Sequence, residues 1–303
     1  MDFTRRCIEQ LQEKMQYVKR TAPRMAEALE AQLEILRASP KFALPPNGRC
    51  FDGQFKGLPE ELHLPFPIVV LEYTFETSEE EDAKSAVRQL YTAAQTVRCR
   101  NRIILASENP YIEGGLLVFS FVEMAGAPPQ WVFLPYAVSI APYSSDKKPL
   151  PVFPEFQNIS QLRGPLPFSV GFIPLLDGIE NQSDWEKNAY ADLVDEANVT
   201  LDFIEAMSCS NVTYDTIPAR RQNRAARRRG ALPFDDYHVL VVKVSQKEKH
   251  LMAVGDATHR SPREHLRRGH VRIYKSGLKI WVQSCVVNPG LHGKIKTSYE
   301  VRP

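Results

Sequence analysis

The sequence predicts an α+β fold in which N-terminal helices accompany a mostly antiparallel sheet. Two observations support this prediction: apolar residues recur at helical spacing near the N-terminus, and strand-like segments then follow one another with a single helical segment among them. A third observation is a proline-rich stretch in the middle of the chain. It divides the sequence into an N-terminal α+β domain (1–141), a linker or surface excursion (142–182), and a domain with a basic helix and a β-hairpin (183–303).

The first helical segment extends from Thr4 to Ala38, where apolar residues recur every three or four positions and therefore share one face. Pro23 lies inside this segment. Proline removes a backbone hydrogen bond, so we expect a kink or two helices that meet near residues 21–23. The apolar face suits packing onto the protein's own core, and the alternative is a homodimer formed through Thr4–Ala38.

The remainder of the N-terminal domain should supply the sheet. Phe66–Phe75 is rich in β-branched and aromatic residues, as buried strands are. Ser78 and Glu81 have the spacing of a capping box and predict a helix that ends near Val97. Three further strands are expected at Arg102–Ala106, Gly115–Glu123 and Trp131–Ile140. We expect helices to cover one face of this sheet.

Seven prolines between residues 142 and 174 disfavour both a helix and a central strand, and they define the predicted linker. A second capping box, at Ser183 and Glu186, begins a helix that should end near Ser208. Further along, Tyr237–Val244 has the apolar character of a strand.

Composition limits the class of protein. No run of about 18 apolar residues is present, and the N-terminus lacks the apolar segment of a signal peptide, so we expect no membrane span. The five cysteines are scattered and form no CxxC pair, which is typical of reduced thiols in a cytoplasm and argues against a four-cysteine zinc site. We therefore expect a cytoplasmic protein without a metal or another cofactor.

The net charge of +2 conceals a strong asymmetry. Residues 219–303 contain 19 Lys and Arg but 6 Asp and Glu, a net charge of +13, which leaves −11 for residues 1–218. A basic region joined to an acidic body is typical of proteins that bind polyanions. The alternative is that the two regions neutralise each other across an internal interface.

The basic charge is concentrated in a short run without acidic residues, which contains Arg220, Arg221, Arg224, Arg227, Arg228 and Arg229. If this run is helical, Arg220, Arg224, Arg227 and Arg228 share one face, and Gly230 ends the helix. Guanidinium groups are suited to phosphate oxygens, so the run is a candidate contact for DNA or RNA. Docking onto the acidic body and a solvated loop are the two alternatives.

A second candidate surface lies in the predicted hairpin, which turns at Lys275-Ser276-Gly277. Side chains alternate along its first strand, so His270, Arg272 and Tyr274 share one face, while Val271 and Ile273 should pack inward. Together with Arg267 and Arg268, these polar residues could contact bases, sugars and phosphates.

The same residues could form a metal-free ribonuclease, in which His265 and His270 transfer protons and Arg272 and Tyr274 assist. The spacing of His265 and His270 does not place both on one face of a helix or strand, so a metal clip is not expected. The sequence has no Walker loop, GxGxxG, HExxH or GxSxG motif. The pattern favours binding over catalysis.

Three pieces of the sequence carry a resemblance to a family: Leu64-Pro65-Phe66-Pro67, the segment from Asn211 to Leu240, and Ser261–Arg272 with Ile280-Trp281-Val282. The chain resembles a family of tailed-phage (prophage) hypothetical proteins with a C-terminal HLRRGHxR…WV segment, most strongly over residues 200–303. The resemblance implies a phage origin and expression in a bacterial cytoplasm. It assigns no activity to any residue.

Three functional hypotheses follow. The first is a phage-encoded nucleic-acid-binding protein that uses the arginine run and the His270/Arg272/Tyr274 face. The second is an inhibitor of a host or anti-phage defence protein, which would act through protein–protein contact. The third is the metal-free ribonuclease.

Overall fold

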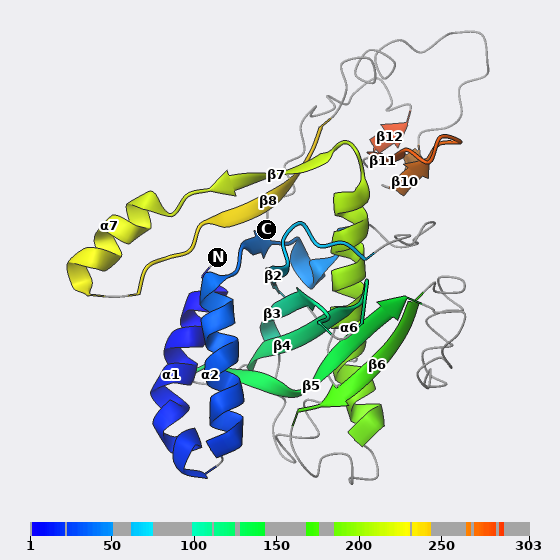
Figure 1. The fold of residues 1–303 in the computed structure, drawn as a ribbon. Coiled ribbons are helices and arrows are strands. Elements are labelled where there is room, and N and C mark those ends of the chain that lie inside the picture. The colour runs from blue at the N-terminus through cyan, green and yellow to red at the C-terminus, as the bar shows by residue number, and fades with distance from the viewer. Residues whose placement is uncertain are drawn as a thin grey trace, which may run out of the picture.

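The fold is centred on one mixed eight-stranded sheet with the strand order β6-β5-β4-β3-β2-β1-β8-β7 (Figure 1). The computed structural model describes residues 2–21, 23–50, 62–74, 99–110, 112–124, 128–142, 168–175, 185–230, 232–243, 265–267, 270–282 and 285–287. In chain order, the sheet contains β1 (Lys41–Ala43), β2 (Ile68–Thr74), β3 (Cys99–Glu108), β4 (Leu116–Met124), β5 (Gln130–Pro142), β6 (Phe168–Pro174), β7 (Val212–Ile217) and β8 (Tyr237–Val242). The α+β class is confirmed.

Most neighbouring strands are antiparallel, as predicted. The exception is the short strand β1, which pairs in parallel with β2 on one side and with β8 on the other. A 3₁₀ turn, η1 (Pro46–Gly48), follows β1. The expected strands at 66–75, 102–106, 115–123, 131–140 and 237–244 correspond to β2, β3, β4, β5 and β8.

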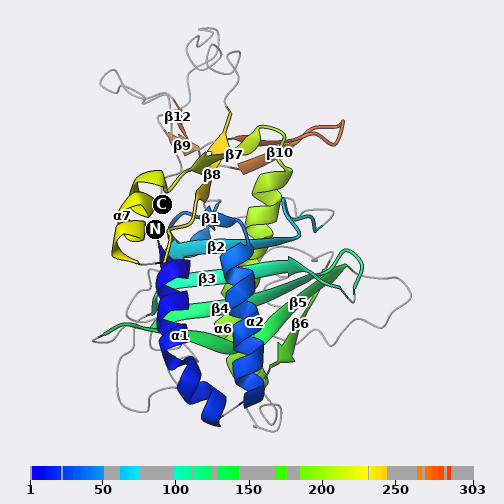
Figure 2. The same cartoon turned by 60° about the vertical axis from the view of Figure 1, so that its left-hand side comes forward.

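Helices cover both faces of the sheet, which corrects the expectation of one covered face (Figure 2). Helices α1 (Phe3–Thr21) and α2 (Pro23–Ala38) pack on one face, and α6 (Trp185–Ser208) packs on the other. The reason is the alternation of side chains along the strands. Val70 and Ile103 join the cluster beneath α1 and α2, whereas Leu71 and Ile104 join the cluster beneath α6, so both faces are apolar.

The break at Pro23 is confirmed, because α1 ends at Thr21 and α2 begins at Pro23. The apolar face of α1 is buried against the protein's own sheet through Cys7, Ile8, Leu11 and Met15. The face that the homodimer hypothesis invoked is thus occupied within one chain. None of the described helices has the length and apolar character that a membrane crossing requires.

Strand β6 was not expected, because it lies within the proline-rich stretch 142–182. It pairs with β5 alone and forms one edge of the sheet. An edge strand tolerates proline, since one side of its backbone needs no ladder partner. Residues 143–167 and 176–184, and the helix expected over Ser78–Val97, lie outside the described residues.

The sheet also extends across the expected division of the chain, because β7 and β8 from residues 183–303 add to β1 from residues 1–141. Helix α6 of the same C-terminal region packs beneath β3, β4 and β5. Hydrogen bonds and core packing therefore join the two regions. Their division into separate folding units stays a prediction.

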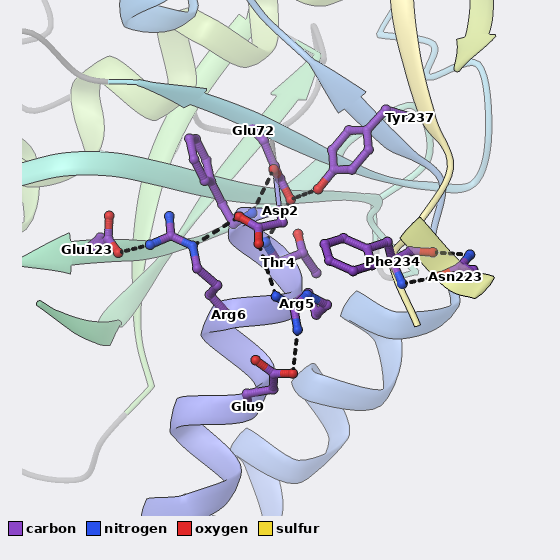
Figure 3. Close-up of polar contacts among 11 residues, drawn as sticks. Asp2, Thr4, Arg5, Arg6, Glu9, Glu72, Glu123, Asn223, Phe234 and Tyr237 are labelled. Carbon is purple, nitrogen blue, oxygen red and sulfur yellow. Dashed lines mark hydrogen bonds and ion pairs between the residues drawn. The ribbon is translucent and has the colours of Figure 1, made fainter. Parts of the chain in front are cut away.

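A buried carboxylate, Glu72 on β2, joins the sheet to α1 and β8 (Figure 3). It accepts hydrogen bonds from the backbone N–H groups of Phe3 (3.2 Å) and Thr4 (2.8 Å) at the start of α1. The hydroxyl of Tyr237 on β8 donates to the same carboxylate at 2.8 Å. A negative group at a helix N-terminus satisfies N–H groups that have no partner within the helix and interacts favourably with the helix dipole.

Burial raises the pKa of Glu72 above its ordinary value, although the hydrogen bonds from Thr4, Tyr237 and Phe3 oppose the rise. At pH values between the ordinary and the raised pKa, Glu72 therefore keeps its proton in the folded protein but has lost it in the unfolded chain. Consequently, Glu72 should reduce the free energy of unfolding as pH rises from the ordinary carboxyl pKa through the raised one. Glu72→Gln should remove this contribution, whose slope is at most about 1.4 kcal/mol per pH unit. Urea unfolding at a series of pH values measures it.

Glu13→Gln, at an exposed position of α1, is the matched control. Parallel stability profiles for the wild-type protein and Glu72→Gln across this pH range would contradict the prediction.

Candidate nucleic-acid interface

The arginine run forms a helix, α7 (Arg220–Arg229), as the sequence predicted. It is inserted between β7 and β8 and lies at one end of this strand pair (Figure 1). Just before the helix, the N–H of Ala219 donates to the Asp236 carboxylate at 2.8 Å. Gly230 ends the helix in the left-handed conformation (φ 64°), and its N–H contacts the carbonyls of Ala226 and Arg227. No atom would approach a Cβ at Gly230 within 4 Å, so backbone conformation alone favours glycine there.

The inner face of α7 is held by one asparagine (Figure 3). The side-chain nitrogen of Asn223 donates to the carbonyl of Phe234 at 2.9 Å, and its side-chain oxygen accepts from the Phe234 N–H at 2.6 Å. Ala219 and Ala226 are buried on the same side of the helix. This inner face orients α7 relative to the segment that leads into β8.

The segment that supports α7 also contacts α1. The guanidinium of Arg5 lies 4.3 Å from the centre of the Phe234 ring, a cation–π contact. Arg5 is itself held by Glu9 at 2.7 Å and by Asp2 at 3.1 Å. The position of α7 is therefore linked through Phe234 to the first turns of α1.

The outer face of α7 presents a dense positive charge. Five side chains are exposed: Arg220, Arg224, Arg227, Arg228 and Arg229. Within the described ranges, no ion pair joins any of them to an acidic residue. Docking onto the acidic body stays a prediction, because acidic stretches of that body lie outside the described residues. The side chain of the sixth, Arg221, lies outside the description. Arg220, Arg224, Arg227 and Arg228 share one face, and Arg229 lies on another flank of the helix. We name these five exposed side chains together the arginine face.

The predicted hairpin is also present. Strands β10 (His270–Ile273) and β11 (Lys279–Val282) pair antiparallel, and the N–H of Tyr274 donates to the carbonyl of Leu278 at 2.9 Å. Gly277 occupies the turn with φ 81°, a conformation that glycine readily adopts. Arg272 and Tyr274 are exposed.

One expectation about the hairpin is wrong. Val271 packs against the core cluster, but Ile273 is 49% exposed rather than buried. The two side chains differ in burial because they lie at different positions along the hairpin. Val271 pairs with the buried Trp281, whereas Ile273 pairs with Lys279, one step nearer the turn, where the hairpin extends beyond the core.

The hairpin is anchored at the junction of α6 and β7. The Asn211 side chain donates to the carbonyl of Trp281 at 2.9 Å and accepts from its N–H at 2.8 Å. The N–H of Ser210 donates to the carbonyl of Lys279 at 2.9 Å. Because Asn211 directly precedes β7, the hairpin lies at the start of that strand.

The arginine face and the hairpin therefore lie at opposite ends of β7 (Figures 1 and 2). The six residues of β7 separate Asn211 from the approach to α7, a distance of roughly 20 Å along an extended strand. The two groups of predicted contact residues form two separate surfaces.

The remaining predicted contact residues lie on short paired strands or outside the residues that the structure describes. Strand β9 (His265–Arg267) pairs with β12 (Cys285–Val287), so His265 and His270 belong to different two-stranded ladders. The side chains of His265, Arg267 and His270, and the whole of Arg268, lie outside the described residues. Among the side chains that are described, no group of three or more His, Cys, Asp or Glu is placed to hold a metal ion.

Sequence reasoning overlooked His238 on β8. Its ring stacks with Phe66 and contacts Tyr214 edge-on, and its Nδ1 lies 3.0 Å from the Thr216 hydroxyl. Burial lowers the pKa of His238, although Asp236 opposes this effect. The lowered pKa favours the neutral imidazole, which forms part of an aromatic cluster. A lone histidine in an apolar strand carries no sequence signal for this role.

Comparison of the chain with protein-family models, with curated proteins and with solved structures finds no match.

The reciprocal bonds of Asn223 yield a prediction. Asn223→Ala should lower the free energy of unfolding by about 1–3 kcal/mol, because the Phe234 N–H and carbonyl lose their partner while partly buried. It should also speed hydrogen exchange at the Phe234 amide. Chemical unfolding and native-state hydrogen exchange measure the two effects. Gln222→Ala, the exposed neighbour, is the control, and equal effects of both substitutions would show that Asn223 does not hold the helix.

Proposed function

We propose that the protein binds nucleic acid and that the arginine face of α7 contacts its phosphates. The observation that carries this proposal is five exposed arginines on one ten-residue helix, without an acidic partner among the described residues. Each guanidinium presents a planar set of donors that matches phosphate oxygens. The resemblance to tailed-phage proteins supports a role in the cytoplasm of an infected bacterium.

The preformed helix strengthens this proposal. Like charges at i, i+4 repel each other, so Arg220, Arg224 and Arg228 destabilise α7 in the absence of a polyanion. The Asn223–Phe234 bonds and the buried alanines offset this repulsion. A ligand then meets a helix that is already ordered and relieves its charge repulsion, which reduces the entropy lost on binding.

The exposed Arg272 and Tyr274 offer a second contact surface for the same ligand. Tyrosine can stack on a base, and arginine can contact phosphate. This surface is separated from α7 by at least the length of β7, roughly 20 Å, so reaching it would take at least about six base pairs of duplex or a comparable length of single strand. We therefore propose an extended ligand that follows β7.

The two other hypotheses gain no specific support. The ribonuclease needs His265 and His270, whose side chains lie outside the described residues. The inhibitor of a host or anti-phage defence protein needs a protein-binding surface, and no observation on the described residues identifies a protein partner. Both stay predictions from the sequence.

Replacing three arginines should weaken binding strongly and reduce its salt dependence. Arg224→Ala/Arg227→Ala/Arg228→Ala keeps good helix formers in α7 but removes up to three phosphate contacts. The slope of log affinity against log salt should become shallower by about 2–3, and affinity at low salt should fall by about tenfold or more. Fluorescence anisotropy with labelled DNA and RNA, measured over a range of salt concentrations, tests this.

The matched control is Lys19→Ala/Arg20→Ala/Arg37→Ala, which removes the same charge from exposed positions on α1 and α2. It should bind nearly as tightly as the wild-type protein. If the two triple variants lose affinity equally, binding depends on net charge alone, and the assignment of the interface to α7 is wrong.

A further inference from the structure

A small cavity lies beneath the first turn of α7. Its volume is about 140 Å³, and it is bounded by the end of β7, the start of α7 and the segment that enters β8. Typical pockets for drug-sized ligands measure about 300–1,000 Å³, so this cavity has room for a ring system but not for a complete nucleotide.

The cavity walls are largely apolar. Ile217, Pro218, Phe234 and Val239 contribute carbon surface to them. Ile217 is 55% exposed, which is high for a large apolar side chain on a strand. A planar, weakly polar ring would cover this apolar surface, as bases do when they stack in single-strand binding sites.

Two polar side chains reach the same space. Gln222, exposed on α7, provides an amide that can both donate and accept hydrogen bonds. Asp235 provides a carboxylate whose position is fixed by the Lys41 ammonium at 3.3 Å, and that lysine is itself 3% exposed. A carboxylate accepts hydrogen bonds from exocyclic amino groups, and a glutamine amide pairs with adenine, so amino-bearing bases suit this pair.

Arg220 directly follows the lining residue Ala219 and lies in the first turn of α7. Arg229 lies two turns further along the helix flank that carries Gln222, since residues seven apart share a flank. A phosphate can therefore remain outside the cavity against α7 while its base points inward.

We propose that this cavity receives one unpaired nucleobase of a strand whose phosphates contact the arginine face. The inference rests on the proposed nucleic-acid binding and deepens it by specifying the substrate class. A base that is paired within a duplex cannot enter, so the protein prefers single strands that contain adenine or cytosine.

The test compares three labelled ligands of equal length on the full chain. The first is a single strand of about 12 nucleotides of alternating dA and dC, a length within the usual range of single-strand site sizes. The second is the same strand without bases, and the third is the duplex of the first strand with its complement. Anisotropy at fixed salt should give about tenfold tighter binding to the single strand than to the abasic strand, because a stacked base contributes that much. The duplex should also bind more weakly than the single strand.

Two variants test whether the preference for the single strand over the abasic strand arises at the cavity. Val239→Phe fills the cavity and should bring the ratio of single-strand to abasic affinity close to one, with abasic affinity unchanged. Gln222→Ala removes one polar contact without adding volume, and it should lower the ratio of single-strand to abasic affinity by a few fold. This variant keeps the test decisive if Val239→Phe fails to fold. Gln16→Ala, exposed on α1, is the control and should leave the ratio unchanged.

The outcomes separate the two proposals. If all three ligands bind the wild-type protein equally, the base site is wrong while nucleic-acid binding stands. If none binds, both proposals fail. If folded Val239→Phe or Gln222→Ala retains the full single-strand preference, the preference arises elsewhere and the cavity is not the base site.

Discussion

The buried carboxylate of Glu72 is the contact on which the placement of α7 depends. It accepts hydrogen bonds from the first turn of α1 and from Tyr237 at the start of β8, so it joins three elements that are distant in sequence. Burial and the adjacent Glu72 raise the pKa of Tyr237, and its hydroxyl therefore remains a donor. The same turns of α1 present Arg5 to Phe234, which in turn bonds Asn223 of α7. One acidic residue thus connects the core of the sheet to the exposed basic helix.

The charge asymmetry of the sequence has a structural counterpart. Several acidic residues of the body are buried, and Glu196 on α6 is one of them. Its carboxylate pairs with the guanidinium of Arg102 and accepts a hydrogen bond from the Ser120 hydroxyl at 3.1 Å. A carboxylate held in the core by its own partners cannot neutralise a helix at the surface. Because Glu196 and Arg102 both belong to residues 1–218, their pair adds nothing to the net charge of −11. The arginine face keeps its positive charge toward solvent because its side chains are exposed.

Local patterns predicted much of the fold, whereas long-range pairings were missed. The break at Pro23, the end of α7 at Gly230 and the turn at Gly277 follow from conformational preferences within a few residues. Strands β1 and β7 escaped prediction because one is three residues long and the other is polar and lies at an edge. Strand position in a sheet depends on partners elsewhere in the chain. The bonds of Asn223 and Asn211 were missed for the same reason, since a single asparagine gives no periodic signal.

The spacing of the predicted contact residues suits an extended ligand. Proton transfer and charge stabilisation require groups within hydrogen-bond reach of one reacting atom. The arginine face and the Arg272/Tyr274 surface are separated by at least the length of β7, roughly 20 Å, so they cannot act on one atom. An extended polymer can contact two surfaces that are far apart, because they need not meet at one atom. Once one end is bound, the second surface meets the ligand at a high effective concentration, so two modest contacts yield a tighter complex than either alone. The ribonuclease hypothesis does not involve the arginine face, so this separation does not test it. The separation is one that a polymer-binding surface can use.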